Sequence, residues 1–315
     1  MKPRILVIRG GAIGDFILTL PAIRLLRENF PDAHLEILGY QHVVALADRR
    51  FYADATRSIE YSAMSGFFVP RSELAPDLAE YFASFQQVIS YLFDLDGFFE
   101  ANLRRAGVKN LISAYTKIDD SAHASRQLAL PLQSLALFLD DPAATLHPSP
   151  DDMQFAAEFL GEIRQPIIAL HPGSGGTRKN WPMQRWAALG DWLLAHPKRP
   201  RLLVVGGEAD HAQLDFLRSR WGKTETLWAR DFPLPHLAAV LKKCAVFLGH
   251  DSGISHLAAA VGTPCVLIFG ATDPEIWAPA NSHVSVLRAA DGDLARLTVE
   301  SFQERLKPLL ESLRS

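Results

Sequence analysis

The sequence predicts an α/β protein with two domains, each built on a parallel β-sheet. Short apolar segments of strand length alternate with amphipathic helical segments in both halves of the chain, as in sheets whose parallel strands are joined by helices. Leu202–Val205 and Val266–Phe269 are continuously apolar, which is typical of strands buried on both faces. The pattern favours Rossmann-like winding in each half, with a ligand at the carboxyl ends of the strands and between the domains.

The element boundaries follow from the apolar periodicity and from Pro and Gly. In the first half we expect strands at Ile5–Ile8, Leu35–Leu38, Ser58–Tyr61, Val88–Leu92 and Leu111–Ala114, and the clearest helices at Asp15–Asn29 and Ser121–Leu139. In the second half we expect strands at Ile167–Leu170, Leu202–Val205, Val246–Leu248, Cys265–Phe269 and Val284–Leu287. Helices there are expected at Pro182–Ala195, Asp210–Trp221, Pro235–Lys243 and Ser252–Val261. A segment rich in Pro and Asp, from Asp140 to Pro150, separates a domain of residues 1–148 from one of residues 149–298, and a last helix is expected over Val299–Leu313.

The composition limits the class of protein. The 315 residues are 48% hydrophobic and carry a net charge of −3, so a general nucleic-acid binder is not expected. Cys244 and Cys265 lie in apolar segments, as reduced thiols of a cytoplasmic protein do. The chain opens directly into a strand without a signal-peptide pattern, and no uninterrupted apolar segment reaches the length of a spanning helix. We therefore expect a cytoplasmic protein whose membrane contact is peripheral.

The segment from Val246 to Gly262 is the most informative. An apolar strand ends in Asp251-Ser252-Gly253, and a helix of small residues follows. Such a junction directs free N–H groups and the positive end of the helix dipole to one place, where a diphosphate fits. His256, one turn into the helix, is placed to bind a sugar or a phosphate. The alternative is an ordinary capped helix with a structural histidine.

The first strand is followed by Arg9-Gly10-Gly11-Ala12-Ile13-Gly14-Asp15. The glycines allow a tight turn and the close approach of a ligand. Asp15, where the helix begins, is either an N-cap or a general base directed at an acceptor hydroxyl. The glycine spacing differs from G-x-G-x-x-G, and no acidic residue follows the second strand at Gly39-Tyr40, so a dinucleotide site is not expected.

The loop His171–Pro182 is rich in glycine and lies between a strand and a helix. Ser174 and Thr177 offer hydroxyls, and Arg178 and Lys179 offer cations, which suit phosphate oxygens. The residue order differs from that of a Walker A loop. The alternative is a flexible basic surface loop.

Two further strand ends carry polar residues. Glu208 follows Gly206-Gly207 and either accepts hydrogen bonds from a ribose or lies in a solvated turn. Thr272 and Asp273 follow Phe269-Gly270 and either line the same cleft or begin a turn. No group of residues has metal-ligand spacing, and there is no G-x-S-x-G elbow.

Together these motifs resemble the ADP-heptose:lipopolysaccharide heptosyltransferases, glycosyltransferase family 9. The resemblance covers nearly the whole chain and is strongest over Ile5–Pro31, His171–Trp186 and Val246–Pro274. It implies a GT-B fold, in which two Rossmann-like domains face a cleft. The first domain would bind the acceptor and the second the nucleotide sugar, and the final helix would pack back on the first domain.

The resemblance also assigns roles to individual residues. It implies that Asp15 is the catalytic base, with Arg9 and Gly14 at the acceptor. The donor diphosphate would be bound by Ser174, Lys179, Ser252 and Gly253. The donor sugar or ribose would be contacted by Glu208, Asp251 and His256, and the adenine by the region of Phe232.

The reaction implied is a direct displacement with inversion. Asp15 would take the proton of the acceptor hydroxyl as the oxygen of that hydroxyl attacks the anomeric carbon. Lys179 and the N-terminus of the helix that begins at Ser252 would stabilise the leaving ADP. These protein groups can stabilise the negative charge that develops on the leaving diphosphate, so we expect no metal or other cofactor. The expected donor is an ADP-sugar. The expected sugar is heptose, and the expected acceptor is a lipid-linked glycan such as the lipopolysaccharide core, met at the cytoplasmic face of the inner membrane.

Two departures from the family pattern leave the acceptor open. The region Thr56–Arg71 lacks the paired arginines expected opposite acidic inner-core sugars, and His250 replaces an apolar residue before Asp251. One alternative is a GT-B transferase with another nucleotide sugar and acceptor. The other is a non-catalytic nucleotide-sugar or glycan-binding protein, against which Asp15 and Lys179 together argue, because a binder needs no base.

Overall fold

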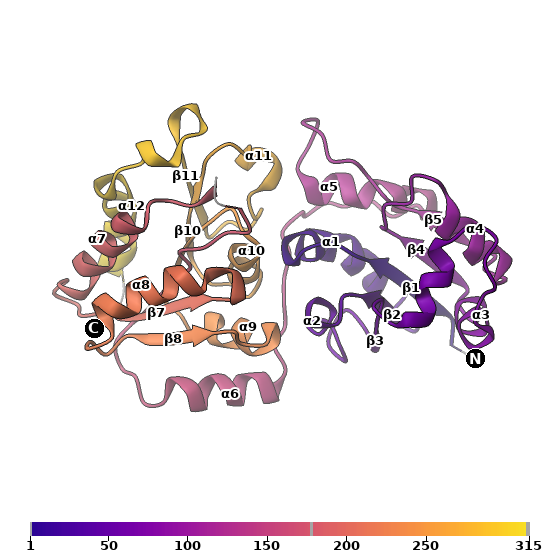
Figure 1. The fold of residues 1–315 in the computed structure, drawn as a ribbon, viewed down its shortest axis with the longest axis horizontal. Coiled ribbons are helices and arrows are strands. Elements are labelled where there is room, and N and C mark those ends of the chain that lie inside the picture. Colours follow the sequence, from indigo (N-terminus) through magenta and orange to yellow (C-terminus); the bar gives the residue numbers. More distant parts are fainter. Residues whose placement is uncertain (1, 177–178, 313–315) are drawn as a thin grey trace. The chain divides into compact units, whose positions relative to one another are not determined.

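Two parallel β-sheets organise the chain, one in each of two units (Figure 1). The computed structural model describes residues 2–176 and 179–312. The units divide between Pro142 and Ala143, inside the segment from Asp140 to Pro150 that is rich in Pro and Asp.

The first unit has a five-stranded sheet in the order β3-β2-β1-β4-β5. Its strands are β1 (Arg4–Arg9), β2 (His34–Gly39), β3 (Ala55–Ser58), β4 (Gln87–Ser90) and β5 (Leu111–Ser113). All pairs are parallel. The order is that of a Rossmann-like sheet, in which the strands before β4 are added on one side of β1 and the later strands on the other side. The strand predicted at Ser58–Tyr61 was placed too late, because Ser58 already pairs with Gly39, the last residue of β2.

Helices connect these strands. The unit contains α1 (Ile13–Asn29), α2 (Gln41–Val44), α3 (Pro76–Ala83), α4 (Phe98–Arg105) and α5 (Ala124–Ala129), with 3₁₀-helices η1 (Ser62–Phe68) and η2 (Leu130–Leu135). The single helix predicted over Ser121–Leu139 was wrong. It is divided into α5 and η2, because Pro131 has no N–H to continue the α-helical ladder.

The second unit repeats this plan with six parallel strands in the order β11-β10-β9-β6-β7-β8. They are β6 (Ile167–Leu170), β7 (Arg201–Gly206), β8 (Leu227–Arg230), β9 (Val246–His250), β10 (Cys265–Phe269) and β11 (Val284–Arg288). Its helices are α6 (Pro150–Leu160), α7 (Met183–Leu194), α8 (His211–Trp221), α9 (Leu234–Lys242), α10 (Gly253–Ala260), α11 (Pro274–Trp277) and α12 (Val299–Ser312). The sheet order reverses between β6 and β9, which is where ligands bind in open α/β sheets.

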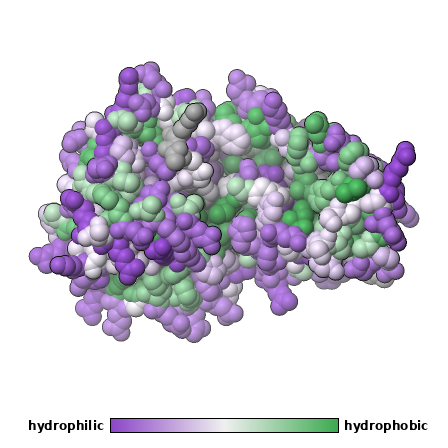
Figure 2. Space-filling model, in the orientation of Figure 1, coloured by the Kyte–Doolittle hydropathy of each residue, from purple (hydrophilic) through white to green (hydrophobic). Residues whose placement is uncertain are grey.

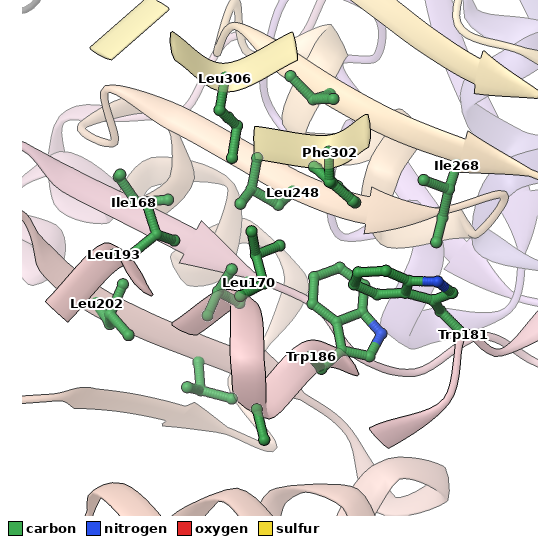
Figure 3. Close-up of a cluster of buried hydrophobic side chains, with 14 of the residues drawn as sticks. Ile168, Leu170, Trp181, Trp186, Leu193, Leu202, Leu248, Ile268, Phe302 and Leu306 are labelled. Atoms are coloured by element: carbon green, nitrogen blue, oxygen red, sulfur yellow. The ribbon is translucent and has the colours of Figure 1, made fainter. Parts of the chain in front are cut away.

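The last helix belongs to the core of the second unit. α12 packs against α7, and Phe302 and Leu306 are buried in the same cluster as Trp186. Figure 3 shows these side chains beside the strand residues Leu248 and Ile268. The second unit covers the apolar face of this helix, and the expected contact of the helix with the first domain stays a prediction. Leu313, the predicted end, lies outside the described residues.

Both cysteines are buried free thiols, as predicted. Burial raises the pKa of Cys244 to about 12. The face of the molecule in Figure 2 mixes hydrophilic and hydrophobic residues. Over residues 2–176 and 179–312, no helix has both the length and the apolar character needed to cross a bilayer.

Candidate active site

The predicted donor residues of the second unit follow strands that are neighbours in the sheet. Ser174 and Lys179 follow β6, Glu208 follows β7, and Asp251 follows β9. Because β9, β6 and β7 are adjacent and parallel, their carboxyl ends meet at one edge. The sheet order therefore gathers residues from three distant segments at the point where it reverses.

The N-terminus of α10 has the geometry of an anion site. Ser252 is its N-cap in an extended conformation, and the Ser252 hydroxyl oxygen accepts a hydrogen bond of 3.3 Å from the Ser255 N–H. Gly253 and Ile254 lie in the first turn, where an N–H group has no helical acceptor. These donors and the helix dipole favour a negative charge.

Lys179 places a cation beside this helix. Its ammonium donates to Asp251 Oδ2 at 2.6 Å, and the Thr272 hydroxyl donates to the same oxygen at 2.7 Å. The Lys179 side chain is 43% exposed and that of Asp251 11% exposed. The pair thus connects the loop after β6 with the turn after β9 and leaves the ammonium accessible to a ligand.

Ser174 is engaged within its own loop. Its hydroxyl lies 2.7 Å from Asn180 Oδ1 and 3.0 Å from the Gly176 carbonyl oxygen, and the residue is buried. The hydroxyl therefore shapes the loop. Thr177 and Arg178, the other phosphate-binding candidates of this loop, lie outside the described residues.

The remaining donor candidates differ in accessibility. Glu208 is exposed at the start of the 3₁₀-helix Glu208–Asp210. His256 is only 5% exposed within α10. Phe232 packs edge-on against Phe155 and Phe159, with ring centroids 5.4 and 4.9 Å away. Of the three, Glu208 is the most open to solvent.

Sequence analysis missed a buried pair behind this edge. His171 Nε2 lies 3.2 Å from Asp210 Oδ2, and both side chains are almost fully buried. Burial alone would raise the pKa of Asp210, but the hydrogen bonds from His171 and from the Gly207 N–H are among the effects that outweigh it and keep that pKa below its ordinary value. The signal in the sequence is weak, because Asp210 appears there only as the first residue of a helix.

His250 has a structural role in the same region. Its Nε2 accepts a hydrogen bond of 2.7 Å from the Trp181 N–H, and its Nδ1 lies 3.1 Å from the Gly173 carbonyl oxygen. Burial lowers the pKa of His250 to about 3. The neutral ring thus anchors the loop after β6 to the end of β9. No group of three or more potential metal-ligating side chains occurs in the described part of the chain.

In the first unit, Asp15 is the third residue of α1, and its carboxylate caps the helix. Oδ2 accepts a hydrogen bond of 2.9 Å from the Ala12 N–H, and the side chain is 43% exposed. The N-cap is Ala12, so the interpretation of Asp15 as the N-cap itself is corrected. Gly11 has a φ of 95°, and a Cβ there would lie 2.8 Å from Asp15 Oδ2. The turn therefore requires glycine at this position.

Arg9 joins Asp15 at the carboxyl end of β1. Its Nη2 donates to the Asp15 carbonyl oxygen at 3.1 Å and lies 3.9 Å from Oδ1. Burial lowers the pKa of Arg9, against the opposing effect of the Asp15 charge. The Arg9 guanidinium lies 5.9 Å from the ring centroid of Tyr91, which follows β4. In the described structure, Arg9 Nε and the Tyr91 hydroxyl are buried without a hydrogen-bond partner.

A pocket of about 320 Å³ lies near the carboxyl ends of β4 and β5. Its lining includes Glu100 and Ser113, which are hydrogen-bonded to each other, together with Phe93 and Tyr115. The rings of Phe93 and Tyr115 contact each other at 5.0 Å and are exposed. Gly14 lies in the first turn of α1. The first unit thus offers a carboxylate, a guanidinium and aromatic rings at the ends of its strands.

Comparison with known proteins identifies the family of the chain. The profile of glycosyltransferase family 9 (heptosyltransferase) matches residues 99–306. The chain belongs to this family. It is therefore a glycosyltransferase, and its two parallel-sheet α/β units are those of a GT-B fold.

Several relatives of the chain match most of its length at modest identity. "Lipopolysaccharide heptosyltransferase 3" of Escherichia coli is 24% identical over 88% of this chain and 86% of its own length. The solved family 9 glycosyltransferase of Veillonella parvula superposes with a TM-score of 0.79 at 20% identity, over 98% of each chain. E. coli ADP-heptose lipopolysaccharide heptosyltransferase II superposes with a TM-score of 0.76 at 19% identity, over 99% of each chain. The two solved structures share the fold of this chain over nearly its whole length.

Proposed function

We propose that this enzyme transfers heptose from ADP-heptose, with inversion, to the lipopolysaccharide core or a related surface glycan. Relatives named for heptosyl transfer to lipopolysaccharide or lipooligosaccharide support the sugar and the acceptor class. Structures of E. coli heptosyltransferase WaaC, described with ADP and with ADP-2-deoxy-2-fluoro heptose, support the nucleotide.

The observation that carries the proposal is the pairing of Lys179 with the N-terminus of α10. The Lys179 side chain is 43% exposed, and its ammonium donates at 2.6 Å to Asp251, the residue directly before the N-cap Ser252 and the first-turn residue Gly253 of α10. A diphosphate leaving group gains negative charge as its bond to the sugar breaks, and preorganised donors stabilise that charge. In the proposal, Lys179, Ser252, Gly253 and the Ser174 loop bind the diphosphate.

Asp251, Glu208 and His256 complete the proposed donor site. Asp251 holds Lys179 through Oδ2, which leaves Oδ1 for a sugar hydroxyl. Glu208 is exposed at the end of β7, where an acidic residue suits ribose hydroxyls. His256 lies one turn inside α10 and is only 5% exposed. Its proposed contact with the donor sugar or ribose is therefore limited to the small exposed part of its side chain.

Asp15 supplies the base in this proposal. Its Oδ2 is occupied by the Ala12 N–H, and the half-exposed carboxylate keeps Oδ1 for the acceptor. The acceptor oxygen forms its bond to the anomeric carbon on the face opposite ADP, the bond to ADP breaks, and the hydroxyl proton passes to Asp15. Arg9 and Gly14 would position the acceptor, and Arg9 brings a buried Nε that has no partner in the described structure.

The acceptor implies peripheral contact with the cytoplasmic face of the inner membrane. Phe93 and Leu95 beside the first-unit pocket are 64% and 80% exposed. Exposed apolar side chains of this size favour contact with a lipid or another apolar surface. They are placed to receive the apolar part of a lipid-linked glycan.

A calorimetric titration with ADP-, UDP-, GDP- and TDP-sugars tests the donor. We expect ADP-heptose to bind most tightly and to be consumed when a heptose-deficient lipopolysaccharide is added. Preferential binding of another nucleotide sugar would indicate a different transferase. Binding of ADP-heptose without transfer to any glycan would indicate a binding protein.

A further inference from the structure

We infer that His171, held by Asp210, is a positioning residue that fixes the Ser252 hydroxyl at the N-terminus of α10 for donor binding. The inference rests on the proposed function, because it takes the donor diphosphate to bind at this helix. It adds a buried pair behind the binding surface to the residues that contact the donor.

The three residues form a continuous chain of polar contacts. Asp210 Oδ2 lies 3.2 Å from His171 Nε2, and His171 Nδ1 lies 3.3 Å from Ser252 Oγ. The residues follow β7, β6 and β9, respectively. The chain thus runs across the strand ends where the sheet order reverses and ends on the cap of the anion-binding helix.

Donor and acceptor chemistry sets the direction of these bonds. Asp210 is an acceptor, and its Oδ2 also accepts a hydrogen bond of 3.0 Å from the Gly207 N–H. His171 must therefore carry a proton on Nε2, and in the proposed arrangement the ring is the Nε2–H tautomer, in which Nδ1 is an acceptor. The Ser252 hydroxyl donates to Nδ1, and its oxygen remains available to the Ser255 N–H, 3.3 Å away.

The Ser255 hydroxyl is a second possible partner for the Ser252 hydroxyl. Ser255 Oγ lies 3.2 Å from Ser252 Oγ and donates its own proton to the His250 carbonyl oxygen. Without His171, Ser255 Oγ would remain as an acceptor for the Ser252 proton, and the Ser252 hydroxyl would lose the contact that holds it from the side of β6. The first-turn N–H groups of α10 would then be less well ordered for a phosphate.

The surrounding backbone is shaped around Asp210. A Cβ on Gly173 would lie 1.7 Å from Asp210 Oδ1, and a Cβ on Gly206 would lie 3.0 Å from Asp210 Cβ. Glycine at these two positions lets the ends of β6 and β7 close on a buried carboxylate. A buried carboxylate costs free energy unless it accepts hydrogen bonds, and the His171 Nε2–H supplies one at the donor edge.

Calorimetry with ADP on paired variants tests the inference. The amide oxygen introduced by His171→Asn can replace Nδ1 toward Ser252, whereas the amide nitrogen introduced by His171→Gln can replace only Nε2 toward Asp210. We expect His171→Gln to weaken ADP binding roughly tenfold and His171→Asn to weaken it less. Thr263→Val is the matched control, because it removes a buried hydrogen bond of 2.7 Å to the Leu241 carbonyl oxygen in the same unit. It should keep the wild-type ADP affinity, and thermal unfolding of every variant reports folding.

A double-mutant cycle with Ser252→Ala separates positioning from a structural role. In the Ser252→Ala background, His171→Gln should cause no further loss beyond about twofold. An equal loss in both backgrounds, or wild-type ADP affinity in the Gln variant, overturns the inference. If the Gln variant does not fold, the same cycle is run with His171→Asn, and additive losses overturn the inference. If wild-type protein binds no ADP, the proposed function fails and the inference with it, whereas ADP binding with unaffected variants overturns the inference alone.

Discussion

Lys179 and Asp251 share a hydrogen bond of 2.6 Å that connects the loop after β6 to the turn after β9. The two strands are neighbours at the point where the sheet order reverses. Asp251 is nearly buried and is also bound by the Thr272 hydroxyl, so it holds the lysine ammonium in place while the other side of the ammonium faces solvent. A cation held in this way loses little entropy when an anion binds.

Lys179→Ala should therefore weaken ADP binding. We expect a loss of roughly 10- to 100-fold, the scale of one hydrogen bond to a charged group, measured by calorimetry at fixed ionic strength. Lys223→Ala is the matched control, because Lys223 is exposed in the same unit. Equal ADP affinity in the two variants would show that Lys179 does not meet the diphosphate.

Asp15→Asn should separate binding from turnover. The amide oxygen of the substituted side chain can still accept the Ala12 N–H, so α1 should keep its N-terminus, but the side chain can no longer take a proton. We expect unchanged ADP binding and a fall in kcat of about 10²- to 10⁴-fold. Asp77→Asn is the control, since Asp77 is an exposed acid in the first turn of α3. A kcat for Asp15→Asn within a few-fold of wild type would remove Asp15 from the role of base.

His250 should make the folded protein sensitive to mild acid. Its folded pKa is lowered to about 3 by burial, whereas an unfolded histidine titrates near 6.5. Between these values the unfolded state binds one more proton, so the free energy of unfolding falls as the pH falls, by about 1.4 kcal/mol per unit. Unfolding measured between pH 6.5 and 5 should show this slope, and His250→Gln should reduce it. Equal slopes in both proteins would contradict the assignment.

Phe302→Ala should destabilise the second unit by about 3–5 kcal/mol. Phe302 is 1% exposed, and its ring lies 5.5 Å from that of Trp181 and 5.9 Å from that of Trp186. Denaturant unfolding followed by tryptophan fluorescence measures the effect. Phe216→Ala, at a side chain 40% exposed in α8, should change the free energy of unfolding by less than about 0.5 kcal/mol. Similar values for the two variants would place α12 outside the core.

Two strands with a continuous apolar run were predicted correctly, whereas two strands of mixed composition were shifted or missed. β6 and β10 have the predicted bounds Ile167–Leu170 and Cys265–Phe269, because a continuous apolar run reports burial directly. The edge strand β8 was missed, since Leu227–Arg230 mixes apolar and charged residues. The last helix was located correctly, but its periodicity shows only an apolar face and does not show that the second unit covers that face.

In the candidate site, the sequence showed individual polar residues but not the contacts that depend on folding. Lys179 and Asp251 were recognised as polar residues after apolar strands, and the structure joins them. The partner of His171 was not predicted, because Asp210 is 39 residues away and reaches it only through the packing at Gly173. The capping role of Asp15 toward Ala12 depends on the turn at Gly11, which the sequence shows only as a glycine.

The most direct test of the proposed reaction is transfer itself. Purified protein is incubated with ADP-heptose and heptose-deficient lipopolysaccharide, and ADP release, the mass of the acceptor and the anomeric configuration of the product are measured together. We predict that one heptose is added for each ADP released, with inverted configuration, and that Asp15→Asn slows both by about 10²- to 10⁴-fold. Retained configuration, or full transfer by the Asp15→Asn variant, would contradict the account.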